Sequence, residues 1–396
     1  MSERPQLRLL PKIKPAKFRR GAPFVFANEL VMDRRTRNIE AGTIGTLVDD
    51  ERNPLAAIAV NPDSKIAGRI LDLDPDAEIT SDWLKARLGA ALAMREALYD
   101  APFYRLCHGE GDGLSGLVVD RYGDVLSIQP NAAWTQSHLP VIIEVLEGLT
   151  KAKVIYKNAS SRSRKLEGLD ETSEFLKGTQ EGPVEVPMNG ALYLADIAQG
   201  QKTGLFLDQR ENHAFAARLA KGQQVLDVFC NVGGFGLAAL AAGAERCLAI
   251  DGSFPALELA AQAAERMGVI DQFETRKSDA VKAMRAMAEE ETRYGLVICD
   301  PPAFAPHAQA LHSGLRGYEN VALTAARLVT SGGFLVLCSC SQAADLDSFR
   351  NACLTGIGKA GRQASLIHTG GPGPDHPTHP QLAAQTYLKS LFFKLY

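Results

Sequence analysis

Two short apolar runs in this chain end abruptly in residues that can carry out chemistry. The run 296–299 is followed by Asp300, and the run 334–338 is followed closely by Cys340. Buried parallel strands of an α/β sheet are continuous apolar runs, and their carboxyl ends meet at one edge of the sheet. We therefore expect a carboxylate and a thiol to be neighbours at that edge. Such a pair suits nucleophilic attack on a pyrimidine ring.

The reaction that this pair favours is addition of the Cys340 thiolate to a cytosine. C5 of cytosine is a poor nucleophile, and a thiolate that adds at C6 turns the ring into an enamine that reacts at C5. This is covalent catalysis, and it needs an exposed thiol. Cys340 lies beyond its strand, where we expect exposure, whereas Cys299 and Cys338 are expected in the core. Asp300 would accept a hydrogen bond from the cytosine amino group or share a proton with N3.

The segment that follows Asp300 leaves two alternatives open. Phe304 either stacks on the target base, which must leave its own stack to react, or packs in the core. The same Asp-Pro-Pro-Ala-Phe segment suits enzymes that methylate purine nitrogens, which need no thiol, so Cys340 is the residue that favours C5 chemistry. A non-catalytic RNA-binding or ribosome-assembly factor that has kept the fold is a third interpretation.

A nucleoside site is indicated by a glycine-containing turn and two later acids. The strand 225–229 runs into a loop that contains Gly233, and glycine there lets a ligand approach the backbone. Asp251 ends the next strand, eighteen residues beyond Gly233, where the acid that binds ribose hydroxyls is expected. Asp279 follows the third strand and could reach an adenine amino group. Each acid alone could be a helix cap, and NAD is an alternative ligand, although the loop lacks the G-x-G-x-x-G spacing.

The pattern of apolar, polar and turn-forming residues changes twice along the chain, which predicts three regions of an α/β protein. Up to about residue 75, short β-like pieces punctuated by Gly and Pro predict a small β-rich module. The middle region predicts an α+β fold with an antiparallel sheet and a hairpin at Asn189-Gly190. From about residue 198, apolar strands alternate with helical stretches, which predicts a doubly wound parallel sheet.

Individual elements follow from the same patterns. The strands expected in the first region are 43–48, 55–60 and 67–71. A helix is expected over 81–99, with Ser81 or Asp82 as its cap. The polar span 158–182 is expected to be a loop, and 387–396 a last, antiparallel strand.

Bulk composition narrows the class of protein. The 396 residues are 46% hydrophobic and 22% charged, which fits a soluble protein of two or three domains. No apolar run resembles a signal peptide or approaches the length of a membrane span, so we expect a cytoplasmic protein with no membrane partner. Seven scattered cysteines, without a second pair at zinc spacing, argue against a disulfide framework and a structural metal site.

Charge is distributed unevenly along the chain. The net charge is −3, yet residues 1–40 contain ten Lys and Arg against four acids. A local basic face can attract phosphate whatever the charge of the whole chain. Lys14, Lys17 and Arg19 are therefore candidates for nucleic-acid contact, and a solvated surface is the alternative.

Four segments together resemble the bacterial 23S ribosomal RNA large-subunit methyltransferase I family of cytosine-5 methyltransferases. They are Lys-Thr-Gly-Leu-Phe-Leu-Asp-Gln-Arg at 202–210, Asp-Val-Phe-Cys-Asn-Val-Gly-Gly-Phe at 227–235, Asp-Pro-Pro-Ala-Phe at 300–304 and Cys-Ser-Cys-Ser at 338–341. The resemblance covers nearly the whole chain. It implies a PUA RNA-binding domain over 1–75, a central α+β domain over 76–197 and a Rossmann-like methyltransferase domain over 198–396.

The resemblance also implies ligands and roles. The methyl donor would be S-adenosylmethionine, and the RNA partner would be 23S ribosomal RNA or a partly assembled large subunit. Cys340 and Asp300 would be catalytic, and Lys14, Lys17, Arg19 and Phe304 would contact RNA. The oligomeric state stays open, with a homodimer among the alternatives. The candidate donor-binding residues are Phe206, Gln209, Arg210, Asp227, Asn231, Gly233, Asp251, Asp279 and Asp300.

Three points are not settled by the resemblance. Pro301, Pro302 and Ala303 stand where many RNA cytosine-5 methyltransferases carry a second cysteine, so the base that removes the C5 proton is unassigned. The loop 230–232 reads Cys-Asn-Val where a Tyr-Thr type pair is expected. The residues 202–210 have no mechanism that follows from spacing, and taken alone they predict a β-turn with a salt bridge.

Overall fold

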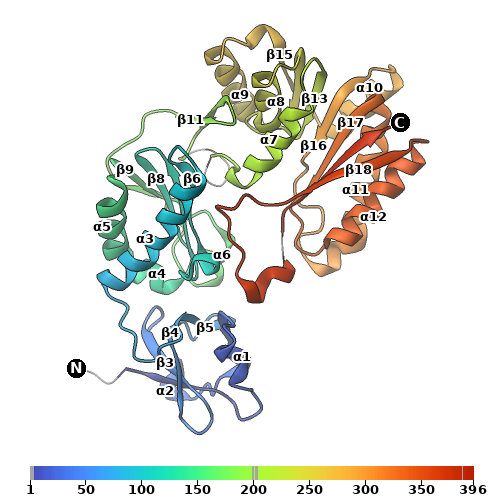
Figure 1. Cartoon of the computed structure of the whole chain (residues 1–396). Helices are drawn as coiled ribbons and strands as arrows, with labels where there is room; N and C mark the ends of the chain where they lie inside the picture. Colours follow the sequence, from blue (N-terminus) through green and yellow to red (C-terminus); the bar gives the residue numbers. More distant parts are fainter. Residues whose placement is uncertain (1–3, 199, 201–203, 386) are drawn as a thin grey trace. The chain divides into compact units, whose positions relative to one another are not determined.

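The computed structural model describes residues 4–198, 200, 204–385 and 387–396. The chain forms two compact units (Figure 1). The first consists of Met1–Gly182 and Pro374–Ala383, and the second of Pro183–Gly373 and Ala384–Tyr396. The division into three domains at residues 75 and 197 stays a prediction.

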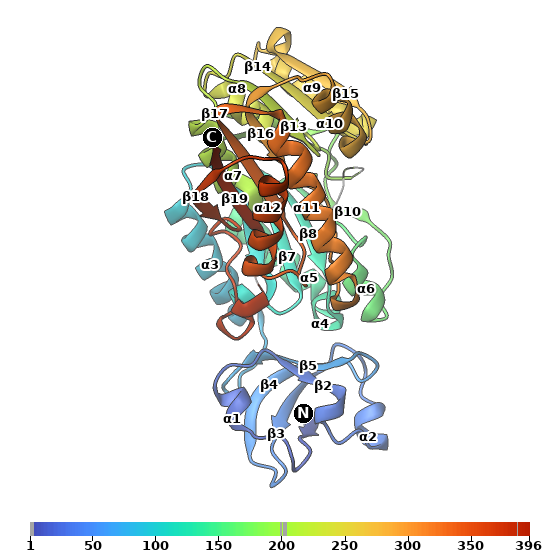
Figure 2. The same ribbon diagram turned by 90° about the vertical axis from the view of Figure 1, so that its right-hand side faces the viewer.

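The N-terminal part of the first unit is a five-stranded sheet with the order β1-β3-β4-β5-β2. The predicted strands are confirmed, and the two edge strands, of three residues each, are too short for their alternation to be recognised. Two short helices, α1 and α2, lie at opposite sides of the sheet in Figure 2. The elements are β1 (Gln6–Arg8), α1 (Ala16–Arg19), β2 (Phe24–Phe26), α2 (Arg34–Arg37), β3 (Ile44–Val48), β4 (Pro54–Val60) and β5 (Ile66–Asp72).

A second five-stranded sheet in this unit has the order β10-β9-β8-β7-β6. Its pairs are antiparallel, as predicted, except that β8 and β9 are parallel. Leucines of α3 and apolar residues of α5 pack against it in one core. The elements are α3 (Ser81–Leu98), β6 (Phe103–His108), β7 (Leu117–Tyr122), β8 (Val125–Pro130), α4 (Ala133–Ser137), α5 (Leu139–Thr150), β9 (Val154–Lys157), α6 (Arg162–Leu166) and β10 (Glu174–Lys177).

Two predictions about this region were wrong. The cap of α3 is Thr80, one residue before the nearer of the two predicted positions, Ser81 and Asp82, because its hydroxyl accepts a hydrogen bond from the Trp83 amide at 3.3 Å. The polar span 158–182 is not a loop throughout, since it contains α6 and β10. The reason is tertiary: the fully buried Arg164 donates hydrogen bonds to the Pro130 carbonyl and to Asp170, which anchors the polar segment.

The second unit contains a seven-stranded sheet with the order β15-β14-β13-β16-β17-β19-β18. Strands β13 to β17 are parallel, and β19 runs antiparallel to β17 and β18. The predicted doubly wound sheet and antiparallel last strand are confirmed, whereas β18, with its many exposed side chains, was not predicted. The strands are β13 (Gln224–Val228), β14 (Arg246–Asp251), β15 (Phe273–Lys277), β16 (Tyr294–Cys299), β17 (Val329–Ser339), β18 (Ala364–Gly370) and β19 (Lys389–Leu395).

Helices cover both faces of this sheet (Figure 1). Leu226 and Val228 of β13 face a core with α10, α11 and α12. Asp227, which points the other way, contacts α8 through the Gly236 amide. The helices are α7 (Arg210–Arg218), α8 (Gly234–Ala241), α9 (Phe254–Arg266), α10 (Ala280–Glu289), α11 (Leu311–Leu328) and α12 (Leu346–Lys359).

The hairpin predicted at Asn189-Gly190 is present. Strands β11 (Val184–Met188) and β12 (Ala191–Ala195) pair in a two-stranded sheet of their own, in the second unit. Asn189 and Gly190 both have positive φ, as a tight hairpin turn requires. Among the described residues, no helix is long and apolar enough to span a bilayer.

Candidate active site

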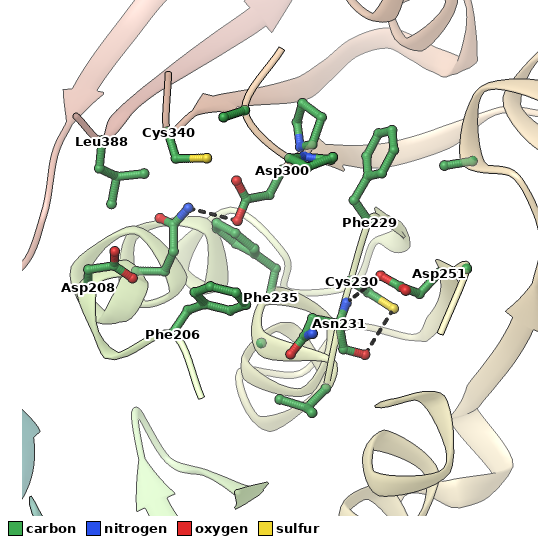
Figure 3. Close-up of a pocket in the computed structure, with 18 of the residues that line it drawn as sticks. Phe206, Asp208, Phe229, Cys230, Asn231, Phe235, Asp251, Asp300, Cys340 and Leu388 are labelled. Carbon is green, nitrogen blue, oxygen red and sulfur yellow. Dashed lines mark hydrogen bonds between the residues drawn. The ribbon is translucent and has the colours of Figure 1, made fainter. Parts of the chain in front are cut away.

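A cavity of about 720 Å³ opens at the carboxyl end of the parallel strands in the second unit. This volume lies within the range of small-molecule sites. Loops that follow β13, β14, β16 and β17 form its walls, so the edge predicted to carry the chemistry is the edge that is hollowed (Figure 3). The predicted site residues that line it are Phe206, Gln209, Asn231, Asp251, Asp279, Asp300 and Cys340.

The loop after β13 is strained and held in place by hydrogen bonds. Phe229 and Asn231 have φ values of 63° and 49°, in the left-handed region that non-glycine residues rarely adopt. The Phe229 amide donates to the Ile250 carbonyl, and the Asn231 amide donates to Asp251 Oδ2, each at 2.9 Å. Such conformations cost about 1–3 kcal/mol each and gather at ligand sites. The strain makes this loop a candidate ligand-binding turn.

Asp251 connects the loop after β13 with the loop after β14. Its Oδ2 accepts the Asn231 amide, and its Oδ1 accepts the Ser253 amide at 2.8 Å. The side chain is half-buried and lines the cavity. Each carboxylate oxygen has a second lone pair, so Asp251 can still accept hydrogen bonds from ligand hydroxyls.

Asp279 is both a helix cap and a residue of the cavity wall. Its Oδ1 accepts the Lys282 amide at the start of α10, at 2.8 Å. The residue is exposed and lines the cavity on the side of β15. The two interpretations of this acid are therefore compatible.

Three predicted donor-binding residues lie outside the cavity wall: Arg210, Asp227 and Gly233. Asp227 is fully buried beneath the loop, where its Oδ2 accepts the Gly236 amide at 2.8 Å and burial raises its pKa to about 7. A Cβ at Gly236 would lie 2.6 Å from the Cys247 sulfur, so only glycine permits this close approach of α8 to the sheet. Asp227 thus supports the loop through its hydrogen bond to the first turn of α8, the helix that follows the loop.

Asp300 is oriented by a residue far away in the sequence. Gln209 Nε2 donates to Asp300 Oδ2 at 2.8 Å, and Asn212 Nδ2 donates to Gln209 Oε1 at 2.6 Å, which fixes the direction of the amide. Residues 207–209 form a 3₁₀ turn that continues into α7, so the predicted β-turn was wrong. Lys202 and Thr203 of the same motif lie outside the described residues.

Cys340 is the half-buried cysteine of this protein. All seven cysteines are in the described residues, and the other six are buried. The predictions that Cys299 and Cys338 belong to the core are confirmed, and burial raises the pKa of both thiols. Cys340 follows the last residue of β17 and lines the cavity beside Asp300 (Figure 3).

A buried hydroxyl network joins the loops that carry Asp300 and Cys340. The Tyr318 hydroxyl lies 2.7 Å from Ser341 Oγ and accepts a hydrogen bond from Ser339 Oγ at 2.9 Å. Ser341 Oγ also accepts the Ala305 amide at 2.9 Å. Sequence reasoning did not identify Tyr318, and the two serines of the Cys-Ser-Cys-Ser segment were its only signal.

The remaining predicted residues are placed as follows. The Phe304 ring packs on Tyr318, with centroids 4.9 Å apart, and does not line the cavity, which favours the packing alternative. Lys14, Lys17 and Arg19 belong to the first unit, where Lys14 and Arg19 are exposed. Lys17 Nζ forms an ion pair with Glu29 at 2.6 Å. Within the described ranges, no cluster of His, Cys, Asp or Glu is placed to hold a metal ion.

Comparison with known proteins decides the family. Residues 105–394 match the family of S-adenosylmethionine-dependent methyltransferases, and residues 9–73 match a PUA-like domain. The chain is 34% identical to the ribosomal RNA large subunit methyltransferase I of Tolumonas auensis, over 96% of this chain and 97% of that protein. It is 32% identical to the protein of the same name from Shewanella denitrificans, over 97% and 99%. The chain belongs to the ribosomal RNA large subunit methyltransferase I family.

Solved structures agree with the fold of a large subunit methyltransferase I. A Streptococcus mutans protein described as an S-adenosylmethionine-dependent methyltransferase matches with a TM-score of 0.80 and 18% identity, over 98% of this chain and all of that one. A methyltransferase structure in complex with S-adenosylhomocysteine matches with a TM-score of 0.81 and 17% identity, over 99% of both chains. The predicted Rossmann-like methyltransferase fold and PUA-like domain are confirmed.

Family membership also settles the donor. The methyl donor of this methyltransferase family is S-adenosylmethionine, and NAD, the alternative ligand of the nucleoside site, is excluded. The residues of the cavity fit such a ligand, because a strained loop, an accepting carboxylate at the end of β14 and an exposed acid at the start of α10 surround a volume of nucleoside size.

Proposed function

We propose that this protein transfers a methyl group from S-adenosylmethionine to C5 of a cytosine in 23S ribosomal RNA, through a covalent bond between Cys340 and C6. The relatives are named as methyltransferases of large-subunit ribosomal RNA. The observation that carries the cytosine assignment is the placement of Cys340, a half-buried thiol that lines the same cavity as the Asp300 carboxylate. Methylation of a purine nitrogen would need no such thiol.

The side chains would divide the work as follows. Cys340 Sγ, as the thiolate, forms a bond to C6, and the electron pair of the C5=C6 bond moves into the ring and makes C5 nucleophilic. S-adenosylmethionine, when bound, supplies the methyl group to C5 and leaves as S-adenosylhomocysteine. A base then removes the C5 proton, the C5=C6 double bond re-forms, and the Sγ–C6 bond breaks to release the thiolate. Asp300, held by Gln209, accepts a hydrogen bond from the cytosine amino group.

The donor would be held at the other side of the cavity. Asp251 would accept hydrogen bonds from the ribose hydroxyls, and Asp279 would accept one from the adenine amino group. Asn231 and Phe206, which line the cavity, would border the donor. Asp227, which accepts the Gly236 amide, and Gly233, the N-cap of α8, would act through that helix, and Arg210 would act through the start of α7.

RNA binding by the first unit is part of the same proposal. PUA-like domains match residues 9–73, and the exposed Lys14 and Arg19 belong to this part of the chain. We assign these cations to phosphate contacts with 23S ribosomal RNA, either free or in a partly assembled subunit. A cytoplasmic location follows from such a substrate.

The test uses ribosomal RNA and immature large subunits from a strain that lacks the gene. Each is incubated with the full-length protein and S-adenosylmethionine, and methylated nucleotides are mapped by mass spectrometry. One cytosine should gain a methyl group at C5. Cys340→Ala should abolish transfer while calorimetry still detects donor binding, and Cys107→Ala, a buried cysteine of the other unit, should transfer normally.

Three results would contradict the proposal. A methylated purine would replace C5 chemistry by nitrogen methylation, with Asp300 as the central residue. Donor-dependent transfer that is unchanged in Cys340→Ala would exclude the covalent step. Binding of RNA without any transfer would point to an assembly factor.

A further inference from the structure

A buried lysine binds the turn that follows the proposed nucleophile. Lys389, the first residue of β19, is only 4% exposed. Its Nζ donates hydrogen bonds to the Ser341 and Ala344 carbonyls, each at 2.6 Å. These two carbonyls belong to the turn that begins directly after Cys340. The ammonium group is therefore held against the backbone that positions the thiol.

Strand pairing makes this position a consequence of register. In the antiparallel pair of β17 and β19, Lys389 is opposite Ser339, the last residue of β17 and the neighbour of Cys340. Leu388, which precedes the lysine, lines the same cavity as Cys340 (Figure 3). A one-residue shift of the register would turn the lysine to the other face of the sheet.

The contacts of Lys389 leave its charge without a closely paired anion. Both hydrogen-bond partners are neutral carbonyls, and within the described part of the chain no carboxylate lies within 4.0 Å of its Nζ. Burial of an unpaired ammonium is costly, and burial lowers the pKa of Lys389. Two groups oppose this effect, namely Cys340 and the exposed Asp345 at the start of α12.

We infer that Lys389 is the cation that stabilises the thiolate form of Cys340. This inference rests on the proposed function, in which Cys340 is the nucleophile. The lysine acts without touching the substrate, so it is a positioning and charge-stabilising residue. Its hydrogen bonds hold the turn 341–344, and its charge compensates the negative sulfur once the thiol proton has left to solvent.

Other charged groups around the thiol act in the opposite direction or not at all. Asp300, from the loop after β16, and Asp345, the N-cap residue before α12, disfavour a second negative charge nearby. The Tyr318 hydroxyl, from α11, is neutral because burial raises its pKa. Asp208, from the 3₁₀ turn before α7, and the α7 residue His213, whose imidazole pKa burial lowers to about 3, line the same cavity, with Asp251 and Asp279 across it.

The experiment measures the reactivity of Cys340 directly. The full-length protein is alkylated with iodoacetamide between pH 5 and 10, and the rate at Cys340 is followed by peptide mass spectrometry. The other six cysteines are buried, so the signal comes from one site. The pH at which the alkylation rate is half-maximal should lie below about 8.5, the ordinary pKa of a cysteine thiol. Lys389→Met should raise it by about one unit and slow alkylation at pH 7 about tenfold.

Two variants separate charge from packing. Lys389→Arg keeps the cation and should preserve the pH profile. Lys394→Met removes a lysine of the same strand, whose Nζ lies over the Phe334 ring, and should leave the profile unchanged. A shift in both Lys389 variants, or in neither, would overturn the inference.

The outcome does not depend on the folding of one variant or on methyl transfer. If Lys389→Met does not fold, the profile of the unaltered protein decides, because half-maximal alkylation at or above pH 8.5 would rule out a stabilised thiolate. If Cys340→Ala still transfers methyl groups, the proposed function fails, while the alkylation profile still reports whether Lys389 stabilises the thiolate.

Discussion

The Gln209 amide donates a hydrogen bond to Asp300, with Nε2 and Oδ2 2.8 Å apart. The two residues are 91 positions apart in the sequence. The bond fixes the direction of the carboxylate at the carboxyl end of β16, because Asn212 in turn fixes the direction of the Gln209 amide. Gln209, a residue proposed to border the donor, is thereby connected to Asp300, which is proposed to bind the cytosine.

Loss of this hydrogen bond should slow the reaction more than it weakens donor binding. In Gln209→Ala, we expect kcat to fall about 10- to 100-fold, since a misplacement of about 1 Å at the reacting centre has effects of that size. Calorimetry should show a donor Kd within a few-fold of the original. Gln363→Ala, at an exposed position, is the control. A large rise in the donor Kd with unchanged kcat would instead make Gln209 a donor ligand.

The Tyr318 hydroxyl should stabilise both the protein and the alignment of its active site. Tyr318→Phe leaves the buried hydroxyls of Ser339 and Ser341 without their shared partner, so the free energy of unfolding should fall by about 1–3 kcal/mol. Urea unfolding measures this, and kcat should fall as well. Tyr396→Phe removes an exposed hydroxyl and should change neither quantity. Equal stability of the two variants would contradict a structural role of the network.

Asp227 should make stability depend on pH in a defined direction. Burial raises the pKa of this carboxyl group to about 7, above the ordinary value of about 3.9, so the fold favours the protonated form. Its contribution to stability is then complete below pH 4 and is lost as the pH rises to 7. Asp227→Asn should therefore gain stability relative to the original protein between pH 5 and 8, by roughly 2–4 kcal/mol.

Urea unfolding of both proteins across this pH range is the measurement for Asp227. Other titrating groups cancel in the difference between the two proteins. Asp271→Asn, at an exposed position, should run parallel to the original protein. A difference for Asp227→Asn that does not change with pH would mean that the carboxyl group is ionised throughout.

Exposed cations of the first unit should set the salt dependence of RNA binding. Lys14→Glu with Arg19→Glu should weaken binding, and the slope of log K against log salt should become shallower by about one for each phosphate that the protein no longer neutralises. Lys17 is less suitable for reversal, because it is paired with Glu29. Filter binding at several salt concentrations is the assay, and Lys85→Glu with Lys221→Glu is the matched control. Equal slopes for both pairs would leave the basic stretch as solvated surface.

The architecture of the second unit, and the edge that carries the site, could be predicted from the order of residues alone. Asp300 and Cys340 both follow apolar runs, and parallel strands bring their carboxyl ends to one edge, so their proximity could be predicted without coordinates. The burial of Cys299 and Cys338 followed from the same pattern. The hairpin at Asn189-Gly190 was predictable because only a few residues tolerate positive φ at both turn positions.

The support of the site residues, by contrast, depends on how the chain folds in three dimensions. Gln209 reaches Asp300, Tyr318 joins two loops, and Lys389 binds the turn after Cys340, although each contact links residues far apart in sequence. The polar segment around Arg164 is ordered by the buried carbonyl of Pro130 in the same way. Local periodicity reports which face of an element is buried, but a hydrogen bond between distant elements depends on strand order, register and side-chain reach, which exist only once the whole sheet has formed.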